Sequence, residues 1–433
     1  MRLLFISLSA LFISLLLLIT GNAFLLTLLG VRFGQLGIDA FTIGLVMVCY
    51  SVGFVIGSLY AAKIIRRVGH IRAFAVFAAL AAMAALVYPM TDTVWLWGLM
   101  RIFGGIAVAC LFVTIESWFS AVATNANRST IFSVYQIAAY LATACGQLLI
   151  GVSSPMGFAA FSLVALFLVA AIIPLSLSHM HSPELAEPKE KMSFTRMMKI
   201  APLGVVGAFC SGFFLGAFYA LTPLFASLTG LDGNQISIYM FGSILAAMLF
   251  AWPIGWVCDR SQRSNVLLVI CVAGSAAAIG NAWFIEADFL MRLLLSCACM
   301  GLGASVYPIS VAITNDQMDS SQIIAASTGL LLSYSFGSVV GPLVSSVFME
   351  QYGAATLFET LAVALLCMAL YTLYRQHIRA PLPVEVQEEY VTVTSLPNAQ
   401  FIPEFDPRNE EFVDTPIEEL FDEEAEEPAK EYE

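Results

Sequence analysis

The most constraining feature of this sequence is a series of twelve apolar runs, each long enough to cross a bilayer. A membrane-spanning helix needs about 20 predominantly apolar residues. The runs cover 3–29, 42–65, 72–90, 94–119, 129–151, 156–176, 201–228, 237–257, 265–284, 289–313, 323–349 and 354–374. Only 12% of the residues are charged, against about 25% in soluble proteins. We therefore expect an all-α membrane protein with twelve transmembrane helices.

The charges between the runs predict the orientation of the chain. Positively charged residues accumulate on the cytoplasmic side of membrane proteins. With a cytoplasmic N-terminus, 14 Lys/Arg residues fall on the inside and only Arg32 falls outside, while Arg101 and Arg292 lie within apolar runs. Both termini are therefore predicted to be cytoplasmic, in a multi-pass protein of the bacterial inner membrane.

A long internal loop divides the chain into two groups of six helices. We expect an N-terminal bundle over 1–176, a cytoplasmic loop over 177–200, a C-terminal bundle over 201–375 and a tail over 376–433. The segment 99–101 reads Leu-Met-Arg and recurs at 290–292, an offset of 191, while Gly146 aligns with Gly341 at an offset of 195. Offsets that agree this closely indicate two parallel, pseudo-symmetric halves.

This organisation resembles the major facilitator superfamily, in which a Gly-x-x-x-Asp-Arg-x-Gly-Arg pattern recurs after helices two and eight. The second half matches it in part from Gly255 to Arg263, with Gln262 where Gly is usual. In the first half Arg66 stands where the acidic residue is usual, which puts a latch based on that carboxylate in doubt. The resemblance implies a cytoplasmic gating network of Arg66, Arg67, Gly69, Glu116, Arg128, Asp259, Arg260 and Arg263.

A closer likeness is to the YcaD-like bacterial subgroup of that superfamily. It rests on four segments, which are Val113–Ser117, Trp252–Gly255, Val306–Pro308 and Leu330–Pro342. The likeness covers about residues 1–375 and leaves out the tail. It implies a transporter of a small solute, and it makes proton coupling an expectation, but it does not indicate the substrate or the direction of transport.

Two ionisable residues of the fourth run are candidates for function, because charges inside a bilayer are costly and rare. With a helix starting at Val94, Arg101 lies about 10 Å below the outer edge and Glu116 about 33 Å, near the cytoplasmic surface. We expect Arg101 to bind an anionic group or to respond to a nearby proton; the alternative is a structural arginine that donates to backbone carbonyls. We expect Glu116 to meet Arg128 or the Arg66 and Arg67 cluster; the alternative is a solvated helix end.

Uncharged polar residues give a weaker signal. Gln136, Tyr140, Thr143 and Gln147 share one face of the fifth predicted helix. A polar face in a membrane must look at protein or at water, so packing between helices and the lining of a cavity both remain open. The candidates for substrate binding or coupling are Arg101, Asn22, Gln136, Tyr140, Gln147 and Tyr307.

Missing motifs argue against several classes of function. The chain has no phosphate-binding Gly-x-x-x-x-Gly-Lys-Ser/Thr loop, which excludes direct use of ATP, and no Gly-x-Ser-x-Gly elbow. The 4 histidines fall in segments predicted to be cytoplasmic and lack metal-ligand spacing, and the 9 cysteines lie in or beside apolar runs. We expect no enzymatic activity, no cofactor, no metal site and no nucleic-acid partner.

The net charge of −12 belongs to the tail, since residues 381–433 carry −15 and the rest carries +3. Such acidic composition cannot bury enough apolar surface to fold, so we expect a disordered, solvated extension. Phenylalanines spaced through the acids leave a protein partner as the alternative. The favoured interpretation of the whole chain is a secondary transporter that works by alternating access. The other is a non-transporting membrane sensor or scaffold that signals through its tail.

Overall fold

The architecture follows the twelve apolar runs. The computed structural model describes residues 2–124, 127–177, 194–318, 323–379, 382–387 and 390. Within these ranges, 12 helices are long and apolar enough to cross a membrane. The all-α fold predicted from the sequence is confirmed. The predicted disorder of residues 391–433 concerns a segment outside the described residues, as does most of the loop 177–200.

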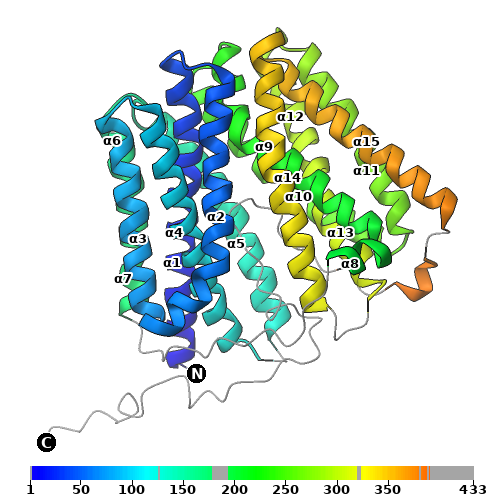
Figure 1. The fold of residues 1–433 in the computed structure, drawn as a ribbon, viewed down its shortest axis with the longest axis horizontal. Coiled ribbons are helices and arrows are strands. Elements are labelled where there is room, and N and C mark those ends of the chain that lie inside the picture. Colours follow the sequence, from blue (N-terminus) through cyan, green and yellow to red (C-terminus); the bar gives the residue numbers. More distant parts are fainter. Residues whose placement is uncertain are drawn as a thin grey trace, which may run out of the picture.

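Six spans form each half of the molecule (Figure 1). The N-terminal half consists of α1 (Arg2–Gln35), α2 (Ala40–Val68), α3 (His70–Val87), α4 (Val94–Val122), α5 (Arg128–Leu148), and α6 (Phe158–Ala170) continued by α7 (Ile172–Ser176). After the short α8 (Phe194–Ile200), the C-terminal half consists of α9 (Pro202–Leu228), α10 (Gly233–Cys258), α11 (Arg263–Trp283), α12 (Phe289–Ala304) continued by α13 (Val306–Asn315), α14 (Ile323–Tyr352) and α15 (Thr356–Ile378).

Short polar turns define where the spans begin. Asp39 caps α2 by accepting a hydrogen bond of 2.8 Å from the backbone N–H of Thr42, and this bond lowers the pKa of the Asp39 carboxyl from its usual value. Asp232 and Gln235 form a reciprocal capping box at the start of α10. At the opposite end of α2, Gly69 adopts a φ of 85°, a conformation that favours glycine, and turns the chain directly into α3.

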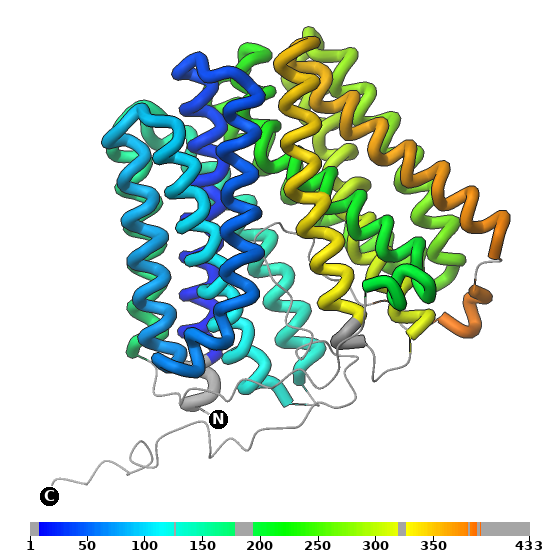
Figure 2. Tube along the Cα trace, viewed as in Figure 1, coloured from blue at the N-terminus to red at the C-terminus, as the bar shows by residue number. Residues whose placement is uncertain are grey.

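The two halves touch at one end of the molecule, the end that holds Arg32, Asp39 and Asp232. There α1 packs on α9, α2 on α14 and α5 on α10. Toward the other end, where the N-terminus lies, the halves diverge (Figure 2). We call these the Arg32 end and the N-terminal end.

Small residues allow the close contact at the Arg32 end. Gly44 of α2 lies directly against Ser346 of α14, and Gly30 of α1 against Pro223 of α9. Two hydrogen bonds cross the interface between the halves at this end. The backbone N–H of Ala40 donates to the Glu350 carboxylate at 2.7 Å, and Ser237 Oγ donates to the Gln147 carbonyl, also at 2.7 Å.

The boundary of the tail differs from the predicted one. Helix α15 runs to Ile378, beyond the predicted end of the bundle at residue 375. A short segment, Leu382–Gln387, then follows the C-terminal half, and Tyr390 packs against its core. The composition of the tail as a whole obscured this, because the acids that dominate it come later in the chain.

Candidate functional site

Arg101 lies in the wall of a cavity between the two halves. It is the eighth residue of α4, and only 3% of its surface is exposed. Its guanidinium carbon sits 4.4 Å from the centre of the Tyr50 ring on α2, a cation–π contact. Arg101 makes no ion pair with any carboxylate in the described ranges. The side chains that interact with its charge are Tyr88, Tyr50 and Cys49, none of which is a carboxylate.

Glycines bring the Arg101 and Tyr50 helices together. A Cβ atom at Gly105 would collide with the backbone carbonyl of Tyr50, and one at Gly53 would collide with that of Ile102. Gly104 has nothing within 4 Å of where its Cβ would be. Of the paired glycines that follow Arg101, only the second therefore sets the spacing of α2 and α4.

Asn22 joins this cluster from α1, because its amide Nδ2 donates to the Tyr50 hydroxyl at 3.3 Å. Both side chains are buried. The structure thus brings two of the sequence candidates to Tyr50, Asn22 at its hydroxyl and Arg101 over its ring. Sequence analysis missed Tyr50 because a tyrosine in an apolar run is indistinguishable from a packed aromatic.

The C-terminal half supplies the opposite wall of the cavity. The cavity encloses about 50 Å³, room for a few water molecules. Its lining comes from α1, α2, α4, α9 and α14: Leu26, Met47, Tyr50, Ser51, Phe54, Val55, Arg101, Gly216, Tyr219, Ala220, Leu331, Tyr334, Ser335, Ser338 and Pro342. Arg101 is the only charged residue among them.

Tyrosines concentrate around this cavity. The Tyr219 hydroxyl is buried without a hydrogen-bond partner. The Tyr334 ring meets Tyr307 of α13 edge-on at 5.1 Å between centroids, and Tyr140 of α5 is close enough to interact electrostatically with Tyr219 and Tyr334. Tyr140 and Tyr307 therefore stand just behind the lining, and Tyr219 and Tyr334 are additions that the sequence did not single out.

The two glutamines of α5 are also buried but do not line the cavity. Gln147 accepts a hydrogen bond from Thr27 of α1, and its Nε2 donates to the backbone carbonyls of Ala23 and Thr143 at 3.5 and 3.1 Å. This side chain therefore ties α5 to α1. Gln136 lies three turns nearer the N-terminal end.

At the N-terminal end, Glu116 is buried, with 2% exposure, and accepts a hydrogen bond of 2.5 Å from the Tyr135 hydroxyl of α5. Arg66 and Arg67 are exposed in the last turn of α2, and Arg128 begins α5. His70 does not lie in a loop; it is buried at the start of α3 with its ring 5.2 Å from that of Trp118. The predicted solvated alternative for Glu116 does not fit its burial.

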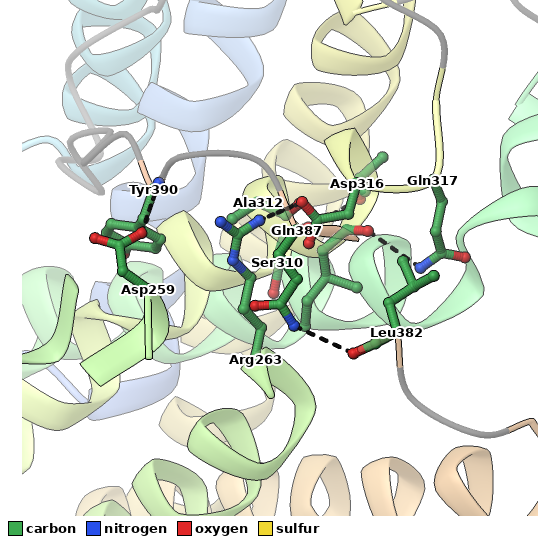
Figure 3. Close-up of polar contacts among 11 residues, drawn as sticks. Asp259, Arg263, Ser310, Ala312, Asp316, Gln317, Leu382, Gln387 and Tyr390 are labelled. Atoms are coloured by element: carbon green, nitrogen blue, oxygen red, sulfur yellow. Dashed lines mark hydrogen bonds and ion pairs between the residues drawn. The ribbon is translucent and has the colours of Figure 1, made fainter. Parts of the chain in front are cut away.

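At the N-terminal end of the molecule, the C-terminal half contains a buried ion pair (Figure 3). The guanidinium of Arg263 pairs with the carboxylate of Asp316, and both side chains are nearly inaccessible. Asp259 instead accepts a 2.9 Å hydrogen bond from the backbone N–H of Tyr390, whose ring lies 5.9 Å from the Arg263 guanidinium. Arg260 stacks over Trp256 at 4.3 Å. Asp316 was missed because it follows an apolar run as an ordinary helix end would.

The described part of the chain contains no cluster of metal-ligating side chains, and the cysteines are all free thiols. The site chemistry therefore rests on one buried cation, aromatic hydroxyls and an apolar lining.

Comparison with known proteins identifies the family. The sequence model of the Major Facilitator Superfamily matches residues 11–305 and 204–403. The chain belongs to the major facilitator superfamily. This superfamily member is 29% identical over 375 residues to the MFS-type transporter YcaD of Escherichia coli, covering 86% of this chain and 96% of YcaD. It is 30% identical over 324 residues to an MFS-type transporter of Yersinia enterocolitica, covering 74% and 83%. The predicted likeness to YcaD is confirmed, and the chain is a multi-pass membrane protein of transporter type.

Solved structures agree on the fold. The crystal structure of the nucleoside transporter NupG superposes with a TM-score of 0.69 at 17% identity, covering 85% of this chain and 98% of NupG. A bacterial homologue of the human lysosomal transporter Spinster, in an inward-facing and unoccupied conformation, gives 0.65 at 14% identity, covering 85% and 95%.

Proposed function

We propose that this protein is a secondary active transporter that moves a small organic anion across the membrane by alternating access. The observation that carries the proposal is Arg101, a buried cation without a carboxylate partner in the described ranges. It lies at the wall of a cavity between two halves that pack together at the Arg32 end. A solute anion at this position would gain a charge-assisted hydrogen bond from the guanidinium. The tyrosine hydroxyls around it would orient the rest of the molecule.

The charge distribution supports a specific orientation. The loops of the N-terminal end carry most of the Lys/Arg residues, which favours a cytoplasmic location for that end and for both termini, in the inner membrane of a bacterium. In this orientation the Arg32 end faces outward. The contacts that join the halves there, from Gly44 to Ser346 and from Ala40 to Glu350, then close the external side. The conformation is therefore inward-facing.

Different residues serve different steps in this proposal. Arg101, with Asn22 behind Tyr50, binds the anion. Tyr140 and Tyr307 position the tyrosines of the lining, and Gln136 and Gln147 hold α5 against its neighbours as the halves move. The set at the N-terminal end, which includes Arg66, Arg67, Gly69, Glu116, Arg128, Asp259, Arg260 and Arg263, closes the internal side in the opposite state.

We further propose that transport is coupled to protons through Glu116. Its carboxylate is buried and hydrogen-bonded to Tyr135, and no acidic residue lines the central cavity in the described part of the chain. Because Glu116 lies about 23 Å along α4 from Arg101, a proton there would act on the gate at the N-terminal end and not on the bound anion.

The experiment has two stages. An unbiased comparison of metabolites between a deletion strain and an overexpressing strain identifies candidate solutes, and uptake into proteoliposomes then tests each one. We expect an organic anion whose uptake rises with an imposed proton gradient and disappears when the protein is omitted. If the purified protein exchanged none of the candidates across the vesicle membrane, the transport proposal would fail, and the non-transporting sensor would remain. If the substrate proved to be neutral or cationic, the transport proposal would stand, but the proposed role of Arg101 in binding an anion would be refuted.

A further inference from the structure

A second cavity lies at the N-terminal end of the C-terminal half, away from the central one. It encloses about 70 Å³ between the ends of α9, α11, α13 and α15, and the segment Leu382–Gln387 forms part of its wall. The lining consists of Pro202, Leu203, Arg263, Ser264, Ile313, Asp316, Gln317, Arg375, Gln376, Arg379, Leu382 and Gln387. Part of this wall, around Arg263, Asp316 and Gln387, is visible in Figure 3.

The cavity has an excess of positive charge. Arg263 is neutralised by Asp316, the only acidic residue in the lining. Arg375 and Arg379 form no ion pair within the described ranges. The two remaining guanidinium groups therefore give the cavity a net charge of about +2, which favours an anion. Their ordinary role would be to stabilise the C-terminal end of α15, where the helix dipole is negative.

A separate feature of the same cavity also points to an anion. Ser264 is the second residue of α11, a helix of 21 residues whose first turn receives no side-chain cap. Its hydroxyl is buried, the residue being 8% exposed, and has no hydrogen-bond partner. Buried hydroxyl groups are almost always paired, and the start of a helix binds phosphate readily. An anionic oxygen in the cavity would satisfy both the hydroxyl and the uncapped end.

We propose that this cavity binds a phosphate group, and that the group belongs to the headgroup of an anionic phospholipid. The cavity lies at the ends of membrane-spanning helices, where headgroups are found. Its remaining walls include the apolar side chains of Leu203, Ile313 and Leu382. The outer face of α15 beside it exposes Tyr374 and Ile378, which acyl chains would contact. The bound headgroup would join four helix ends and the start of the tail into one unit.

The test uses the purified full-length protein and phosphatidylglycerol, with native mass spectrometry for affinity and thermal unfolding for stability. We expect the double variant Arg375→Gln, Arg379→Gln to bind this lipid roughly 30-fold more weakly, about 5-fold for each arginine. The matched control is Lys63→Gln, Arg72→Gln, which removes two exposed charges at the same end of the other half. The control should bind like the unmodified protein.

Ser264→Ala separates a binding role from a structural one. Because it removes a buried hydroxyl that has no partner, the lipid-free protein should be no less stable, whereas its lipid affinity should fall roughly tenfold. Unchanged binding in the arginine variant, or an equal loss in both double variants, would overturn the proposal. So would a lack of binding by the unmodified protein, as expected if the acidic tail occupies the cavity. Stabilisation by inorganic phosphate, without a further effect of the lipid, would refute the phospholipid as the source.

Discussion

Replacing Arg101 tests the proposed substrate site most directly. Arg101→Ala removes the charge and the fork of donors, while Arg101→Lys keeps the charge but cannot form two parallel hydrogen bonds. A hydrogen bond to a charged group contributes about 1.5–3 kcal/mol, so we expect the Ala variant to lose roughly 10- to 150-fold in substrate affinity. The substrate affinity of the Lys variant should fall between that of the unmodified protein and that of the Ala variant.

The surroundings of Arg101 predict that this loss is not caused by unfolding. Removing one member of a buried ion pair is destabilising because it strands the other charge, but Arg101 has no carboxylate partner in the described ranges. The bond between Asn22 and Tyr50 remains in the variant. The folded protein therefore loses mainly the cation–π contact with Tyr50, about 0.5–2 kcal/mol.

Arg32→Ala provides the matched control. Arg32 is also a buried arginine of the N-terminal half, but it donates to the backbone carbonyls of Pro155 and Met156 at 3.2 and 3.0 Å. We expect this variant to unfold at lower temperature and to transport normally per folded molecule. The assay is initial uptake into proteoliposomes, normalised to folded protein, with the melting temperature measured in parallel. Normal uptake per folded molecule in Arg101→Ala would refute the reasoning.

Three other predictions concern topology, the closed end and the buried ion pair. In a variant without native cysteines, Gly233→Cys should react with an impermeant thiol reagent from outside and Arg72→Cys only from inside; reaction from the same side would disprove the topology. Gly44→Leu should separate α2 from α14 and increase the accessibility of the central cavity from the Arg32 end, measured by thiol labelling of cavity positions, and an unchanged pattern would contradict the assigned gate. Asp316→Asn should destabilise the protein by about 3–5 kcal/mol, because it leaves Arg263 unpaired. Thermal unfolding should show that the double variant Arg263→Met, Asp316→Leu recovers most of this stability. If it recovered none, the buried ion pair would not be the cause of the loss.

The fold could be predicted from the sequence because its main determinant is local. The length and apolarity of each run specify a membrane helix, and twelve such runs with repeated segments specify the architecture. The same reasoning gave the starting residue of α4 and therefore the depth of Arg101. It could not give the partner of Arg101, because Tyr50 is more than 50 residues away in sequence and its apolar ring carries no positional signal.

The cytoplasmic network shows the same limit. The charge pattern indicated Glu116 and Arg263 as candidate residues, but the partners that the structure places beside them, Tyr135 and Asp316, were not predicted. The first pair joins the consecutive helices α4 and α5, and the second joins the start of α11 to the residue that follows α13. One sequence without aligned relatives does not show which side chains of two helices face each other. The docking of Tyr390 on Asp259 was missed for the same reason.

A comparison of Arg101 with Arg292 explains why the proposed site has a cation from only one of the two pseudo-symmetric halves. Arg101 and Arg292 occupy corresponding positions in the two halves, and both are buried. Arg292 lies in the first turn of α12 and donates to the hydroxyl and carbonyl groups of Thr229 at the end of α9, within its own half. Arg101 lies one turn deeper in its helix, where its guanidinium lies over the Tyr50 ring and also interacts electrostatically with Tyr88 and Cys49. Arg292 therefore directs donors toward a helix end of its own half, and it does not line the central cavity. Among the residues that line the cavity, Arg101 is the one cation, so we expect the proposed site to bind one anionic group and not two.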